Sequence, residues 1–155
     1  MAANSATGKV ILEAIGHEIG EREFYLALAK RVKNPLVRRK INGLADDELE
    51  HRQTLSRLYW AQTGIEPGKM DAYTSGKEIL DVDNMSLPEL LEIAMENEKK
   101  ASEEYRQMAL DTSDQRASAF LEYLAGYEKE HFETLAGELR KMRSTPGWED
   151  QGPAD

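Results

Sequence analysis

The chain has 155 residues, 40% of them hydrophobic and 32% charged, which fits one soluble globular domain and is too apolar for a disordered chain. Its net charge of −9 argues against binding to nucleic acid or to an anionic membrane surface, because both call for basic patches. The absence of cysteine excludes disulfides, iron–sulfur clusters and thiol catalysis, so any metal must be held by carboxylate and imidazole groups.

No targeting or membrane segment is expected. The longest uninterrupted apolar run, "FYLALA" at 24–29, is far shorter than the roughly 20 residues that a membrane-spanning helix needs. The first ten residues, "MAANSATGKV", lack the basic region and apolar stretch of a secretory signal. The sequence therefore predicts a cytoplasmic protein.

Hydrophobic periodicity and capping signals divide the chain into four helices. In chain order we expect a helix over 8–33, a helix over 35–63, a connection over 64–86, helices over 87–111 and 114–143, and a flexible tail over 146–155. Asn34 and Pro35 supply an N-cap and a proline at the first helical position, and "SLPE" at 86–89 is a capping box.

The connections run short, long, short. Short connections make antiparallel helix pairs, whereas a connection of this length can carry the chain along a whole bundle. We therefore expect one all-α domain over 1–145: a four-helix bundle in which a long crossover connection joins two helical hairpins.

The two hairpins are also related in sequence, because a shift of 80 residues superposes identical side chains. The matching pairs are Ala14 and Ala94, Glu18 and Glu98, Tyr25 and Tyr105, Ala29 and Ala109, Leu44 and Leu124, Glu48 and Glu128, His51 and His131, and Leu55 and Leu135. The chain is two copies of one hairpin, and the copies share polar residues at positions that should be apolar.

These polar residues form a repeated constellation. Glu48 and His51 lie three residues apart, on one face of the second expected helix, as do Glu128 and His131 on the fourth. The first and third helices each add one inward glutamate, at positions 18 and 98. The two-fold repeat therefore brings four carboxylates and two imidazoles together in the core.

Such a cluster is costly without a cation. Burying one unpaired carboxylate costs several kcal/mol, and four of them also repel one another. Two divalent cations balance four carboxylates, and a set of oxygen and imidazole ligands suits iron, with manganese and zinc as alternatives. We interpret the cluster as a dimetal site.

The order Glu18, Glu48-x-x-His51, Glu98, Glu128-x-x-His131 resembles the ferritin-like superfamily of di-iron proteins. The phrases "EREFYLALA", "LADDELEH" and "LAGYEKEH" are similar to rubrerythrin-type (erythrin) domains over about 8–143. The resemblance implies a ferritin-like bundle in which Glu48 and Glu128 bridge two metals, with Glu18 and His51 at one end and Glu98 and His131 at the other.

The chain departs from the family pattern at three points. It has no cysteine for a rubredoxin module. Rubrerythrins often carry an extra glutamate where this chain has Ala101, and the symmetric position on the first helix is Glu21, a candidate for an additional ligand. Bacterioferritins carry a haem-ligating methionine where this chain has Leu49, so no haem is expected.

Four neighbouring side chains bear on the site. Tyr25 and Tyr105 are expected to hydrogen-bond the metal carboxylates, with one-electron donation as the alternative. Asp47 either orients His51 or His131 or is a solvated charge. His17 is expected at the surface.

The resemblance implies a di-iron oxidoreductase, a peroxidase or ferroxidase that reduces hydrogen peroxide or dioxygen. Without a cysteine module, the electrons must come from ferrous iron or from an external electron donor. The alternatives are an iron-binding module for storage or delivery and a structural bundle with an incidental zinc site. A homodimer is also expected, through the apolar segment "LYWAQTG" at 58–64.

Overall fold

The computed structural model describes residues 6–67 and 82–148, and within these ranges it is an all-α bundle. The elements are α1 (Ala6–Arg31), α2 (Pro35–Thr63), the short 3₁₀ helix η2 (Val82–Asn84), α3 (Leu87–Asp111) and α4 (Gln115–Ser144). In these ranges, no helix is long and apolar enough to cross a bilayer.

The helices begin where the capping residues place them. The side chain of Asn34 accepts a hydrogen bond from Leu36 N at 3.0 Å, and that of Ser86 accepts one from Glu89 N at 3.2 Å. Asp114 caps α4 in the same way. At the other end of α2, Gly64 adopts a left-handed backbone with φ of 69°, which glycine reaches at little cost.

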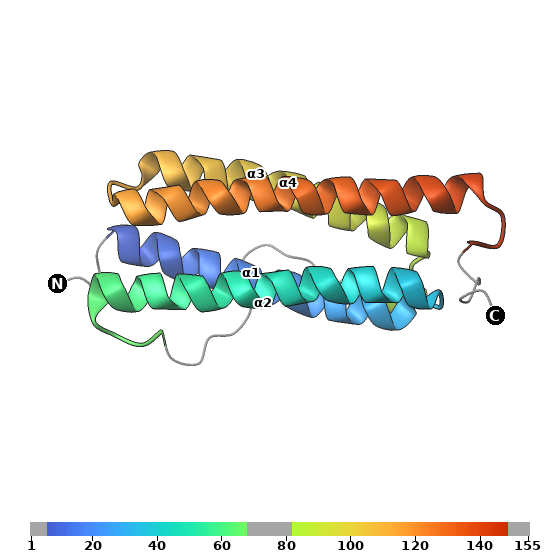
Figure 1. Cartoon of the computed structure of the whole chain (residues 1–155), viewed down its shortest axis with the longest axis horizontal. Coiled ribbons are helices and arrows are strands. Elements are labelled where there is room, and N and C mark those ends of the chain that lie inside the picture. The colour runs from blue at the N-terminus through green and yellow to red at the C-terminus, as the bar shows by residue number, and fades with distance from the viewer. Residues whose placement is uncertain (1–5, 68–81, 149–155) are drawn as a thin grey trace.

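The bundle consists of two hairpins, as the sequence predicts. Helix α1 packs mainly on α2, and α3 packs mainly on α4. Figure 1 shows that α2 ends at one end of the bundle and that α3 begins at the other. Residues 68–81 of the expected crossover and 149–155 of the expected tail lie outside the described residues.

The first residues of the expected tail are packed against the bundle. Residues 145–148 form a turn in which Trp148 N donates to Thr145 O at 3.0 Å. The Trp148 side chain packs against the core, and its carbonyl accepts a hydrogen bond from Asn34. Packing of the indole against the core stabilises the folded state, because it removes apolar surface from water.

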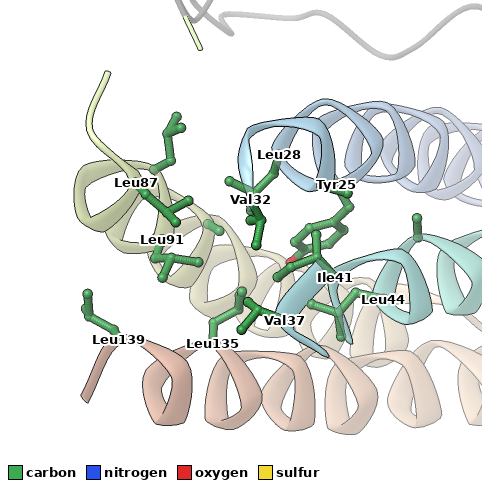
Figure 2. Packing of buried hydrophobic residues seen from close by; sticks show 14 residues of the cluster. Tyr25, Leu28, Val32, Val37, Ile41, Leu44, Leu87, Leu91, Leu135 and Leu139 are labelled. Atoms are coloured by element: carbon green, nitrogen blue, oxygen red, sulfur yellow. The ribbon is translucent and has the colours of Figure 1, made fainter. Parts of the chain in front are cut away.

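Two apolar clusters fill the interior, one toward each end of the bundle. Figure 2 shows the first, to which all four helices contribute leucine or valine side chains. On α2, Leu44 belongs to this cluster and Leu55 to the second, so Glu48 and His51 fall between them. The fold therefore places a polar layer between two apolar ones.

Candidate metal centre

The polar layer is built from one glutamate on each helix. The carboxylates of Glu18, Glu48, Glu98 and Glu128 come from α1, α2, α3 and α4 in turn, and all four residues are fully buried, at 0% exposure. The apolar clusters above and below cover these carboxylates. Four carboxylates share a dry interior in which each needs a compensating partner.

Two histidines complete the layer. His51 Nδ1 lies 3.7 Å from Glu18 Oε1 and 3.9 Å from Glu48 Oε1. His131 Nδ1 lies 3.2 Å from Glu48 Oε1 and 3.7 Å from Glu98 Oε1. Both imidazoles therefore turn their Nδ1 atoms toward the carboxylates.

The six side chains fall into two overlapping groups, in each of which the candidate ligand atoms lie within 4.8 Å of one another. One group is Glu18, Glu48, His51 and Glu128, and the other is Glu98, Glu128 and His131. Glu128 is common to both, and Glu48 reaches toward His131 as well as His51. The structure thus brings together all six residues singled out in the sequence.

The donor atoms of this layer fit metal ions. Eight buried atoms have no hydrogen-bond partner: Glu18 Oε2, both oxygens of Glu48, His51 Nδ1, Glu98 Oε2, both oxygens of Glu128, and His131 Nδ1. A buried polar atom left unpaired is destabilising, and buried polar groups in folded proteins are almost always satisfied. Oxygen and imidazole donors in this number are the set that two ions such as iron, manganese or zinc would satisfy.

Burial and repulsion divide the carboxyl groups into two kinds. The pKa values of Glu48 and Glu128 lie well above the usual value of 4.5, because burial disfavours the charged form and neighbouring carboxylates add repulsion. Burial also acts to raise the pKa values of Glu18 and Glu98, but interactions with a neighbouring glutamate and with a histidine outweigh it and lower both. Without metal, the central pair therefore keeps its protons to a higher pH than the outer pair does.

Two buried tyrosines link the hairpins at this layer. Tyr105 of α3 donates to Glu18 Oε1 of α1 at 3.0 Å, and Tyr25 of α1 donates to Glu98 Oε1 of α3. Burial and nearby carboxylates raise the pKa of both phenols well above 10, so they remain protonated donors. The expected hydrogen bonds to carboxylates are present, and each one crosses between hairpins.

The partners of the two histidines differ. His131 Nε2 lies 3.0 Å from Asp47 Oδ2. Asp47 therefore contacts the histidine of the other hairpin and is not merely a solvated charge. The pKa of His131 is raised, because its interactions with Glu98 and Asp47 outweigh the lowering effect of burial. The ring of Tyr127 meets both histidines edge-on, but it lies closer to His51, with centroids 4.6 Å apart against 5.5 Å for His131.

Glu21 and His17 lie beside this layer. Glu21 is buried, and its Oε1 lies 3.6 Å from Nε2 of His17, but it belongs to neither group of candidate ligands. His17 is not the surface residue that was expected, because its side chain is only 13% exposed and its ring contacts Tyr105 edge-on. Glu21 and Tyr105 therefore contact an imidazole that the helical register alone places outside the core.

Sequence reasoning missed one buried carboxylate. Glu138 of α4 is 2% exposed, and its Oε1 lies 2.5 Å from Lys40 Nζ of α2 and 3.5 Å from Lys141 Nζ. The available signal was the spacing, since Glu138 follows His131 by seven residues on the inward face of the helix.

Comparison with known proteins agrees with this architecture. The sequence model of the rubrerythrin family matches residues 9–139. A hypothetical protein from Pyrococcus furiosus has a similar structure, with 27% identity, a TM-score of 0.70, and coverage of 92% of this chain and 93% of that one. A bacterioferritin from Desulfovibrio desulfuricans, described with a diiron site, shares the fold at 16% identity with a TM-score of 0.75, covering 89% and 80% of the two chains. No curated protein sequence gives a significant match.

Proposed function

The chain belongs to the rubrerythrin family of ferritin-like di-iron proteins, and from that premise we propose that it is an oxidoreductase that reduces hydrogen peroxide or dioxygen at a pair of iron ions. The observation that carries the proposal is the set of eight unpartnered donor atoms, from four glutamates and two histidines, in one buried layer. Iron held by these residues would supply the electrons for cleavage of an O–O bond.

The proposed ligand roles follow the two-fold repeat. Glu18 with His51 would hold one ion, and Glu98 with His131 would hold the other. Glu48 and Glu128 would lie between the two ions, since Glu128 belongs to both groups of candidate ligands and Glu48 lies near both histidines. The bacterioferritin that shares this fold is described with a diiron site, which supports the proposal of two iron ions here.

The surrounding residues hold this set in place. The phenols of Tyr25 and Tyr105 each donate to one outer glutamate and so restrict its rotation. Asp47 accepts from Nε2 of His131, which leaves Nδ1 as the donor toward the ion. Glu21 is a further candidate ligand, which would have to rotate away from His17 to join the site.

Electrons must reach the site from outside this sequence, which contains no cysteine. A separate reductase or fresh ferrous iron would supply them. Ferrous iron as the donor makes ferroxidation the second candidate function, as part of iron storage or delivery, and the absence of a thiol donor is the observation that favours it.

An anaerobic ferrous titration tests the metal site. We expect two irons per chain in the native protein and loss of both in the double variant His51→Ala with His131→Ala. His17→Ala is the matched control, because it removes the remaining histidine of the three, which lies outside both ligand groups. Unchanged iron binding in the double variant would contradict the proposal.

Oxidation of the ferrous-loaded protein separates the two candidate functions. Stopped-flow mixing with peroxide and with dioxygen compares the two oxidants directly. Faster oxidation by peroxide, with turnover restored by a reductase, supports the peroxidase. Faster oxidation by dioxygen, with ferric iron accumulating beyond two per chain, supports iron handling instead.

A further inference from the structure

The sequence repeat is broken at one pair of positions beside the candidate ligands. Asp47 of α2 and Tyr127 of α4 are 80 residues apart and therefore occupy equivalent places in the two hairpins. Asp47 contacts His131, and Tyr127 contacts His51 most closely. Each of the two residues thus faces a candidate ligand of the opposite hairpin, and the two are chemically different.

On the His131 side, the imidazole is backed by a carboxylate. Asp47 Oδ2 lies 3.0 Å from Nε2, so the ring donates its N–H there and presents Nδ1 to Glu48 and Glu98. A carboxylate behind a metal-bound imidazole holds the ring orientation and strengthens the ring nitrogen as a donor.

On the His51 side, the imidazole is backed by aromatic rings and an opening. Tyr127 meets the ring edge-on at 84°, a geometry that packs well but provides no carboxylate acceptor. His51 also lines a surface hollow of about 400 Å³ together with Phe120 and Tyr123, whose side chains stack on each other. Tyr123 is 51% exposed, so this hollow faces solvent.

The candidate ligands themselves do not explain a difference between the two sides. Each side has one outer glutamate and one histidine, and Glu128 belongs to both groups. Glu48 belongs only to the group with His51, but its Oε1 lies 3.9 Å from His51 Nδ1 and 3.2 Å from His131 Nδ1, so this carboxylate lies near both sides. The asymmetry therefore lies in the residues behind the histidines.

We propose that the two metal positions are unequal, with a tightly held ion beside His131 and a weaker, exchangeable ion beside His51 at the α2–α4 hollow. Asp47 and Tyr127 are the positioning residues that set this order. The inference rests on the dimetal site proposed above. Loss of an outer-shell partner typically lowers metal affinity about 10- to 100-fold, which is the difference we expect between the two positions.

Zinc titration followed by NMR of the histidine rings tests the order directly. Zinc is redox-silent, and the chain has three histidines, so each ring can be followed separately. We expect the His131 signals to change over the first equivalent of zinc and the His51 signals over the second. His17, which belongs to neither ligand group, provides the reference signal.

Substitutions at the two unequal positions provide the second arm. Tyr127→Asp restores the repeat and should raise the zinc affinity of the His51 position by about 10-fold or more, so that the two histidine signals change together. Asp47→Asn should weaken the His131 position by a similar factor. Tyr127→Phe keeps the ring contact and is the matched control, expected to preserve the native order.

The outcomes separate this inference from the function it rests on. Simultaneous changes of both histidines in the native protein, or His51 changing first, overturn the unequal positions and leave the dimetal site standing. An unchanged order in Tyr127→Asp also overturns the assigned role of Tyr127. If neither histidine responds and no zinc is retained, the proposed function itself fails.

Discussion

The hydroxyl of Tyr105 lies 3.0 Å from Oε1 of Glu18, which joins α3 of the second hairpin to α1 of the first inside a dry core. The repeat-related bond from Tyr25 to Glu98 joins the same two helices in the opposite direction. These reciprocal bonds lie in the layer of the candidate ligands, so the two hairpins are hydrogen-bonded to each other at the candidate metal centre.

Removal of either phenol should therefore weaken the bundle. We expect Tyr105→Phe to lower the free energy of unfolding by about 1–3 kcal/mol, because a buried carboxylate oxygen loses its donor. Urea denaturation of chelator-treated protein measures the change. Tyr123→Phe is the control, since that side chain is half exposed, and an equal loss there would contradict the assignment.

The central carboxylates should have opposite effects with and without metal. Glu48→Gln with Glu128→Gln removes two buried groups that repel their neighbours once they lose their protons, so at a pH high enough to deprotonate them the chelator-treated variant should melt at a higher temperature than the chelator-treated native protein. Added zinc should stabilise the native protein through preferential binding to the folded state, and the variant should gain little. Thermal melts with and without zinc make the comparison. An equal gain in the variant would show that these two carboxylates are not ligands.

The pH dependence of the metal-free protein follows from the same two groups. Their pKa values in the folded state lie well above 4.5, so the folded state binds protons more tightly than the unfolded state does. The resulting stabilisation is complete below pH 4.5 and is lost as the pH rises through the raised values. We therefore expect the Tm of chelator-treated protein to fall between pH 4.5 and neutrality.

The other titrating groups of the layer do not reverse this trend. The lowered pKa values of Glu18 and Glu98 stabilise the fold above pH 4.5, and that contribution is lost only as the pH falls further. His131 has a raised pKa, so its contribution also declines as the pH rises. The variant Glu48→Gln with Glu128→Gln should show a much flatter profile, and a profile as steep as the native one would contradict the assignment.

The ion pair between Lys40 and Glu138 should be replaceable by an apolar pair. Lys40→Ala leaves the buried Glu138 carboxylate with only the more distant Lys141, and we expect a loss of about 1–3 kcal/mol in the free energy of unfolding. In the 80-residue repeat, Lys40 corresponds to Phe120 and Glu138 corresponds to Leu58. Both of these apolar residues pack on the second apolar cluster.

A double variant tests this equivalence. Lys40→Phe with Glu138→Leu reproduces the apolar pair, and we expect it to be at least as stable as the native protein in urea, because well-packed apolar residues often match a buried ion pair. The single variant Glu138→Leu is the control for the effect of the lone substitution. A double variant less stable than the native protein would contradict the prediction.

Much of the fold was predictable from local signals. The 3.6-residue period, the caps at Asn34 and Ser86 and the 80-residue repeat place four helices and predict that six polar side chains share one layer. The structure has those helices and that convergence. The role of the six residues as metal ligands stays a prediction, now with a geometry that supports it.

The partners of single side chains were less predictable. From the sequence, Asp47 could serve either histidine or none, and His17 was expected at the surface. The structure pairs Asp47 with His131 and partly covers His17 beside Glu21 and Tyr105. The contacts of Asp47 with His131 and of His17 with Tyr105 each depend on a second helix that is distant in the chain, whereas Glu21 lies one turn from His17 on α1.

The sequence by itself determined that a polar, carboxylate-rich layer interrupts the apolar core, because helical periodicity assigns each residue to a face of its own helix. Only the tertiary structure decided that the phenol of each hairpin reaches the glutamate of the other, and that one histidine is backed by a carboxylate and the other by a ring. The physical reason is that such contacts depend on the rotation and axial offset between helices, which the packing of all four apolar faces sets together.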